Sequence, residues 1–198
     1  MNLAELECEQ LLDLASASID TGLAIGRLGP CPPLGACRSF ELKRSTFVTL
    51  KIETRLRGCC GTLEAQRGLA AEVWHNAWAA AFDDPRFEPL CRDEWNEVEL
   101  TISVLSPLEP LMAASEAELL AALRPGIDGL LIEAGPARAT FLPAVWEQLP
   151  DPEGFLGQLK RKAGLPPDFW SPAIRVHRYT AHSIGPRLGA KPATCRPH

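Results

Sequence analysis

Residues 46–63 of the chain read TFVTLKIETRLRGCCGTL, and this stretch decides the fold class. Its first half, residues 46–52, alternates apolar and polar side chains, with Val48, Leu50 and Ile52 on one side. A period of two predicts a strand with one buried face. The second half is rich in glycine and cysteine and predicts a second extended segment.

The residues that follow add a helix and another strand. Residues 69–82 carry an apolar side chain at every fourth position, which predicts a helix that ends before Pro85. Residues 98–104 alternate apolar and polar side chains throughout and predict a strand with one buried face.

Shorter elements fill the rest of the chain. The patterns predict a helix at 4–20, a Gly- and Pro-rich loop at 22–39, a short helix from Ser115, a hairpin of strands at 128–133 and 138–142, helical turns after Pro143 and Pro152, and a last strand at 174–180. Strands and helices are interspersed without strict βαβ alternation. The sequence therefore predicts an α+β fold, a mostly antiparallel sheet with flanking helices, and a loose C-terminal tail at 183–198.

The amino-acid composition favours a globular protein and disfavours several other classes. The 198 residues are 46% hydrophobic and 23% charged, typical of a globular chain rather than a disordered one. The net charge of −5, from 20 basic and 25 acidic residues, disfavours a protein that coats nucleic acid, because such binding depends on neutralising phosphates. The N-terminus lacks the pattern of a secretion signal, and no apolar run reaches the ~18 residues of a membrane helix.

Cysteine usage indicates free thiols. The chain has seven cysteines, an odd number, and two of them, Cys59 and Cys60, are adjacent. Secreted disulfide scaffolds are usually shorter and have even, spaced sets of cysteines. We therefore expect a protein of the reducing cytoplasm.

In an extended chain, the side chains of the two adjacent cysteines would point to opposite faces of the strand. Alternation places Cys60 with Leu56 toward the core, and Cys59 with Arg57 on the opposite face. A neighbouring guanidinium stabilises a thiolate, the form of cysteine that reacts. Cys59 and Arg57 are therefore the candidate catalytic residues.

Two glycines flank this pair and leave the interpretation open. Gly58 and Gly61 remove side-chain bulk, so that either a ligand or another part of the backbone could approach closely. On the first reading Cys59 is a nucleophile in a small pocket. On the second it is a structural cysteine beside glycines needed for a bulge.

The run from Arg57 to Thr62 resembles the R-G-C-I-G-T signature of the AMMECR domain family, whose prokaryotic members are called the A protein of the AmmeMemoRadiSam system. The resemblance covers roughly residues 5–182. It includes, in order, Phe47-Val48-Thr49-Leu50, Asn76-Ala77, Asp84-Pro85-Arg86-Phe87, Ser103-Val104-Leu105, Gly126-Ile127-Asp128-Gly129-Leu130, Thr140-Phe141-Leu142-Pro143 and Lys162-Ala163-Gly164-Leu165. The chain departs from the family pattern at Cys60, where isoleucine is usual, and at Thr54-Arg55, where a glycine is usual.

The resemblance implies an α+β domain over residues 1–182 with a larger and a smaller lobe, and a cleft between them that holds the signature. It also implies an intracellular protein. Its expected partners are a Memo-type protein, related to ring-opening dioxygenases, and a radical SAM protein. It implies a role in modifying a nucleobase or a related small molecule, with no established reaction and no cofactor of its own.

Further side chains are candidates for lining that site. The substrate-binding candidates are Gly58, Gly61, Thr62, His75, Arg86 and Thr140. A histidine beside a carboxylate, as in His75 and Glu72, can act as an oriented base, although such residues more often form a solvated helix face. No metal is predicted, because Cys31 and Cys37 are too far apart for a typical zinc pair.

Three functions remain open at this stage. The first is a component of a modification pathway in which Cys59 serves as nucleophile or covalent anchor. The second is a non-catalytic module that docks the Memo-type or radical SAM partner. The third is a nucleic-acid binder that uses a local basic stripe, which the net acidity disfavours. The stripe would comprise Lys43, Arg44, Lys51, Arg55 and Arg57.

Overall fold

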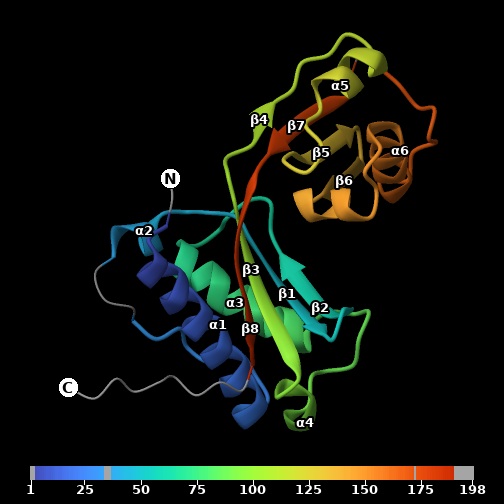
Figure 1. The fold of residues 1–198 in the computed structure, drawn as a ribbon. Coiled ribbons are helices and arrows are strands. Elements are labelled where there is room, and N and C mark those ends of the chain that lie inside the picture. Colours follow the sequence, from blue (N-terminus) through green and yellow to red (C-terminus); the bar gives the residue numbers. More distant parts are fainter. Residues whose placement is uncertain (1–2, 34–36, 172, 190–198) are drawn as a thin grey trace. The chain divides into compact units, whose positions relative to one another are not determined.

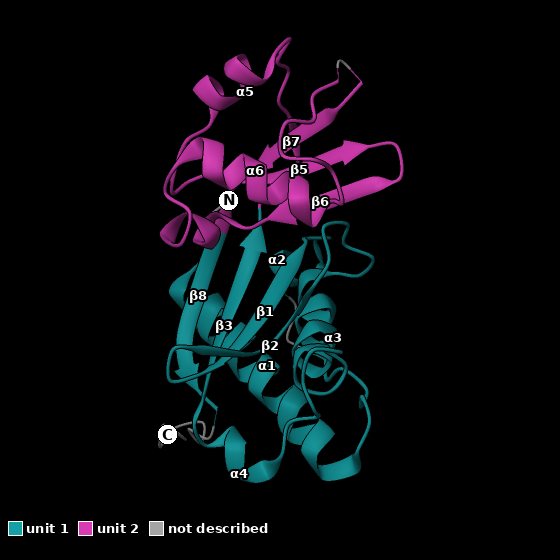
Figure 2. Cartoon of the chain, turned by 90° about the vertical axis from the view of Figure 1, so that its right-hand side faces the viewer, with its two compact units in different colours: residues 1–105, 182–198 teal, residues 106–181 magenta. Residues whose placement is uncertain are grey.

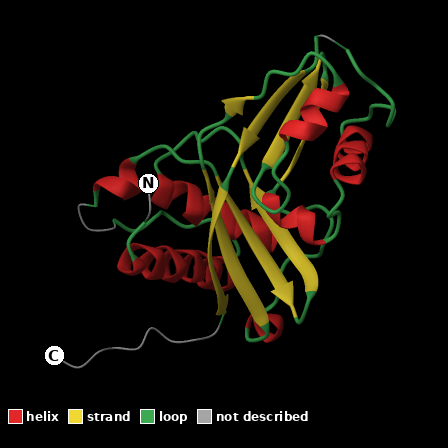
Figure 3. Ribbon diagram, turned by 45° about the horizontal axis from the view of Figure 1, so that its top comes forward, coloured by secondary structure: helices red, strands yellow, loops and turns green. Residues whose placement is uncertain are grey.

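The computed structural model describes residues 3–33, 37–171 and 173–189. These residues form two compact units, one from the described parts of 1–105 and 182–198 and the other from 106–181 (Figure 2). Each unit combines a sheet with helices, so the predicted α+β class is confirmed (Figure 3). In the part of the chain that is described, none of the helices is long and apolar enough to cross a membrane.

Unit 1 is a four-stranded sheet with helices packed on it. Its strands are β1 (Thr46–Ile52), β2 (Arg55–Gly61), β3 (Val98–Leu105) and β8 (Ala181–Leu188), in the order β2-β1-β3-β8. Its helices are α1 (Glu5–Ile25), α2 (Arg38–Glu41), α3 (Leu69–Phe82) and α4 (Arg92–Trp95). The ranges of β1 and α3 are those that the sequence predicts, because both have a continuous apolar period.

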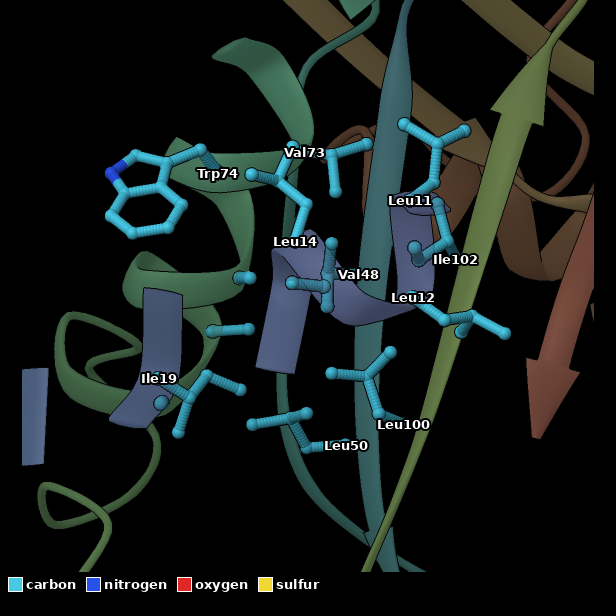
Figure 4. Packing of buried hydrophobic residues seen from close by; sticks show 14 of the residues in the cluster. Leu11, Leu12, Leu14, Ile19, Val48, Leu50, Val73, Trp74, Leu100 and Ile102 are labelled. Atoms are coloured by element: carbon cyan, nitrogen blue, oxygen red, sulfur yellow. The ribbon is translucent and has the colours of Figure 1, made fainter. Parts of the chain in front are cut away.

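The core of unit 1 lies between this sheet and helices α1 and α3 (Figure 1). Leu50 pairs with Leu100 across β1 and β3, and both are fully buried. Ile19 of α1 and Val73 of α3 also point into this core, as Figure 4 shows. The period-two and period-four patterns in the sequence therefore describe two sides of one apolar cluster.

Helix α1 is longer than predicted. The loop prediction from Gly22 is wrong over its first residues, because the helix continues to Ile25 and ends at Gly26, which has a positive φ of 68°. A Cβ on Gly22 would lie 2.3 Å from the Phe82 ring. Gly22 therefore allows α1 and α3 to approach each other, whereas in the sequence a glycine at this position is equally typical of a loop.

The prediction of a loose tail from residue 183 is also wrong in its first part. Residues 183–188 belong to β8, which pairs with β3 at the edge of the sheet. Gly185 and Pro186 hide this strand in the sequence, and a Cβ on Gly185 would lie 2.8 Å from the Leu100 carbonyl oxygen. The later part of that tail, residues 190–198, lies outside the described residues.

Unit 2 has its own sheet and core. Its strands are β4 (Glu109–Pro110), β5 (Gly129–Ala134), β6 (Ala137–Phe141) and β7 (Arg175–Tyr179), in the order β4-β7-β5-β6. Its helices are α5 (Glu116–Ala122), the 3-10 helix η1 (Pro143–Glu147) and α6 (Pro152–Lys162). The predicted hairpin is confirmed as β5 and β6. In the core, the rings of Trp146 and Phe155 stack with centroids 3.9 Å apart.

Candidate functional site

Strand β2 carries the signature residues, and it contains a bulge. Leu50 of β1 lies opposite Gly58, while the next residue, Lys51, lies opposite Leu56, so the ladder skips Arg57. A bulge changes the phase of the alternation. Leu56 is therefore 40% exposed, and the prediction that it faces the core is wrong. Beyond the bulge the phase is as predicted, and Cys60 packs against the core of unit 1.

Cys59 is a partly exposed free thiol near the middle of β2. Its Sγ lies 3.5 Å from the Thr49 hydroxyl oxygen on β1, the residue directly opposite in the sheet. Its backbone N–H donates to Asp84 Oδ2 at 2.9 Å. Side chain and backbone of Cys59 are therefore both held, by different neighbours.

The guanidinium of Arg57 binds a carboxylate on α4. Its Nε and Nη2 donate to the two oxygens of Glu94 at 2.8 and 2.9 Å. This two-pronged hydrogen bond raises the pKa of Arg57 and lowers the pKa of Glu94 to about 2. The Arg57 side chain is only 15% exposed, and its positive charge is paired with the carboxylate of Glu94.

Arg86 is the guanidinium that contacts Cys59 directly. Its Nη2 donates to the Cys59 carbonyl oxygen at 3.4 Å and to Asp84 Oδ2 at 2.7 Å. The Asp84 carboxylate is mostly buried, and its hydrogen bond with Arg86 holds its pKa well below the usual range. The same hydrogen bond is the main cause of the raised pKa of Arg86, and the Cys59 thiol adds to it.

Phe87 lies against both arginines. Its ring centroid is 5.9 Å from Cζ of Arg57 and 5.5 Å from Cζ of Arg86. A cation near an aromatic ring is attracted by the electron density of the ring face. The structure thus brings three predicted site residues together, Arg57, Cys59 and Arg86, with Phe87 beside the two guanidinium groups. We call Arg57, Cys59, Asp84, Arg86 and Glu94 the β2 edge cluster.

The two glycines of the signature lie against other parts of unit 1. A Cβ on Gly58 would lie 2.0 Å from the Ala80 carbonyl oxygen of α3. A Cβ on Gly61 would lie 2.4 Å from the Phe47 ring and the same distance from the Thr46 carbonyl oxygen. Close packing within unit 1 thus accounts for the absence of a side chain at both positions.

Thr62 and His75 have buried polar atoms. The Thr62 hydroxyl and His75 Nδ1 are both shielded from solvent and make no hydrogen bond within the described residues. The carboxylate of Glu72 is fully buried and accepts from the backbone N–H groups of Gln66 and Arg67 at 2.7 and 2.8 Å. Glu72 therefore holds the loop before α3, and the predicted pairing with His75 is not among its hydrogen bonds.

Thr140 belongs to unit 2, where it lies on β6. Its hydroxyl donates to the Leu130 carbonyl oxygen at 2.7 Å and lies 2.5 Å from the Tyr179 hydroxyl. Burial raises the pKa of Tyr179 to about 12, so the phenol remains protonated in this network. Thr140 joins β6 to β5 and β7.

Comparison with known proteins identifies the family of the chain. The AMMECR1 family model matches residues 12–184. The chain belongs to the AMMECR1 family. The match includes the signature on β2 and every residue of the β2 edge cluster.

Relatives of this AMMECR1-family chain occur in archaea and bacteria. A protein of Methanothermobacter thermautotrophicus is 42% identical over 144 residues, which are 72% of this chain and 75% of that protein. A protein of Thermotoga maritima is 37% identical over 143 residues, 71% of this chain and 77% of that one. The crystal structure of the uncharacterized protein PH0010 from Pyrococcus horikoshii has a TM-score of 0.82 and 32% identity, and the match covers 88% of this chain and 89% of that one.

Two members of the β2 edge cluster were not predicted as site residues from the sequence. Asp84 lies in the segment that resembles the family at 84–87, and that resemblance was the available signal. Glu94 carries no such signal, because its role depends on how α4 packs against β2. Over the described ranges, 3–33, 37–171 and 173–189, no three His, Cys, Asp or Glu side chains lie close enough together to hold a metal ion.

Proposed function

We propose that this AMMECR1-family protein contributes a cysteine site to a pathway that modifies a nucleobase or a related small molecule. Cys59 is the nucleophile or the covalent anchor of the substrate. The observation that carries the proposal is the position of Cys59, a partly exposed free thiol on an edge strand beside the Arg86 guanidinium. A nearby cation favours the thiolate, which is the reactive form.

The arginine that can influence Cys59 is not the one expected from the sequence. Arg57 was expected to activate Cys59, but its guanidinium is bound to Glu94. In the proposed site Arg86 therefore takes the electrostatic role, and Arg57 fixes α4 beside the strand. Family resemblance supports a Memo-type protein and a radical SAM protein as the partners of the pathway.

Site-resolved alkylation and a serine variant test the proposal. At neutral pH, iodoacetamide should modify Cys59 faster than Cys60, because burial raises the pKa of Cys60. Cys59→Ser should abolish the output of the pathway in cells, whereas Cys31→Ser, at an exposed thiol in a loop, should not. A Cys59 thiol that resists alkylation, together with full output from Cys59→Ser, would contradict the proposal.

A second function, a docking module without catalysis, is favoured by one observation. Gly58 and Gly61 are both accounted for by packing, so the signature needs no ligand to explain its glycines. The exposed Leu56 on the edge strand β2 would then form part of the docking surface. In a pull-down with purified Memo-type and radical SAM proteins, Arg57→Ala should weaken the complex, while Cys59→Ser should leave it unchanged.

A further inference from the structure

The edge of β2 at Cys59 is occupied by two side chains instead of another strand. β2 is the last strand of its sheet and pairs with β1 on one side. On its other side, the Cys59 N–H donates to Asp84 Oδ2 and the Cys59 carbonyl oxygen accepts from Arg86 Nη2. One acceptor and one donor thus meet a single residue, which is the pattern a neighbouring strand would offer.

The carboxylate of Asp84 organises this arrangement. Its Oδ1 accepts from the backbone N–H of Arg86 at 3.1 Å and from Arg86 Nε at 2.9 Å. Its Oδ2 accepts from Arg86 Nη2 at 2.7 Å and from the Cys59 N–H at 2.9 Å. Asp84 is 8% exposed, so these four hydrogen bonds account for most of what the carboxylate can accept.

A turn at the end of a helix does not require these contacts. The backbone of the turn after α3 is closed by local bonds, from Asp83 N–H to the Ala79 carbonyl and from Phe87 N–H to the Asp84 carbonyl. The Asp84 carboxylate instead reaches a residue 25 positions earlier in the chain, on another element. Its long-range partner is the candidate reactive cysteine.

We propose that Asp84 is a positioning residue for Cys59: it fixes the backbone of the cysteine and aims the Arg86 guanidinium at it. The inference deepens the proposed function and rests on it for its biological meaning. Arg86 alone, which is half exposed, would sample many side-chain conformations. The two-pronged hydrogen bond with Asp84 confines it to the neighbourhood of Cys59.

Two measurements on the full chain test the inference. In Asp84→Asn the hydrogen exchange of the Cys59 amide, followed by NMR, should accelerate about tenfold, as expected for loss of a charge-assisted hydrogen bond. In Arg86→Gln the rate at which iodoacetamide alkylates Cys59 at neutral pH should fall, because a cation near the thiol has been removed, while Arg86→Lys should restore part of the rate.

The decisive result is the coupling between the two positions. If Asp84 aims Arg86, the effect of Arg86→Gln on the alkylation rate of Cys59 should largely vanish in the Asp84→Asn background. Arg92→Gln, which breaks an exposed ion pair with Asp20, is the matched control and should change neither readout. Unchanged exchange of the Cys59 amide, or an equal effect of Arg86→Gln on the alkylation rate in both backgrounds, would overturn the inference.

The test of the positioning role does not depend on the Asp84→Asn variant alone. If Asp84→Asn does not fold, the comparison of Arg86→Gln with Arg86→Lys decides. Equal alkylation rates of Cys59 in the two variants would overturn the inference, because the charge near the thiol would then not matter. Exchange and alkylation report the geometry around Cys59, whereas the pathway output of Cys59→Ser reports its function. The positioning role and the proposed function can therefore fail separately.

Discussion

At the scale of single residues, the pair of Arg57 and Glu94 ties β2 to α4. Two of the three guanidinium nitrogens, Nε and Nη2, and both carboxylate oxygens take part, and the bonds span 37 positions of the chain. Glu94 is about one third exposed, so solvent screens part of the attraction. The pair is still well placed to stabilise the fold, because Arg57 is the bulged residue that β1 does not hold.

The loss of stability caused by Glu94→Gln should therefore depend on pH. The pKa of Glu94 is lowered from 4.5 to about 2 in the folded protein, mainly by the hydrogen bond to Arg57. The stabilisation is then fully present above pH 4.5 and is lost as the pH falls toward 2. We expect Glu94→Gln to lower the free energy of unfolding by about 1–2 kcal/mol at pH 7, and less at pH 3.

Urea unfolding at the two pH values measures this difference. Glu109→Gln is the control, since its carboxylate is 63% exposed and pairs with Arg178 on the surface of unit 2. That substitution should change the free energy of unfolding by less than about 0.5 kcal/mol. An equal loss for Glu94→Gln at both pH values would contradict the assignment of the pKa shift to Arg57.

At the scale of elements, the close approach of β2 to α3 depends on Gly58. A Cβ there would lie 2.0 Å from the Ala80 carbonyl oxygen, a backbone atom that cannot move alone. We expect Gly58→Ala to destabilise the protein by about 3 kcal/mol, since strand and helix must separate. Thermal or urea unfolding measures the change.

A glycine in α6 provides the matched control for this substitution. A Cβ on Gly157 would have no atom within 4 Å, and the residue lies inside a helix. Gly157→Ala should therefore stabilise the protein by about 0.5–1 kcal/mol, because alanine loses less backbone freedom on folding. If both alanine variants had the same sign, packing against α3 would not be the reason for Gly58.

Elements with a strong local pattern could be predicted from the sequence, whereas contacts between distant elements could not. The ranges of β1 and α3 follow from uninterrupted apolar periods. Strand β8 was missed because Gly185 and Pro186 break the alternation and only Ile184 among its residues is buried. The local sequence pattern does not show that a glycine is needed because two backbone segments pack closely against each other.

In the candidate site too, the features set by local sequence could be predicted, whereas the contacts with distant residues could not. Cys59 and Cys60 were correctly assigned to opposite faces, because beyond the bulge the strand keeps its period. The cation at Cys59 was not predicted, since Arg86 reaches it from 27 positions away. Sequence spacing suggested Arg57 instead, and the bulge and Glu94 could not be seen without the fold.

At the scale of the whole molecule, the charge of the chain bears on nucleic-acid binding. The net charge is −5, and Arg57, the last residue of the expected basic stripe, is bound to Glu94. We therefore expect no shift of a structured RNA in an electrophoretic assay at 0.1 M salt with micromolar protein. A shift that weakens steeply as salt is added would restore the nucleic-acid interpretation.

The residues that the structure describes form two hydrophobic clusters, one in each unit. The cluster in unit 1 and the cluster in unit 2 share no residue. Phe155 lies at the centre of the second cluster, where it is fully buried and stacks on Trp146. Cutting such a ring back to a methyl group removes about 3–5 kcal/mol of stability, and the cavity remains within the unit that contains it.

Phe155→Ala should therefore loosen one unit and spare the other. Hydrogen exchange read by mass spectrometry should show faster exchange in β5 and β6, whereas β1 and β3 keep the protection of the unsubstituted protein. Val73→Ala, in the core of unit 1, is the reciprocal variant and should expose β1 and β3 first. Equal loss of protection in both sheets from either variant would mean that the two cores unfold as one cooperative structure, since the free energy removed from one would then be felt throughout the chain.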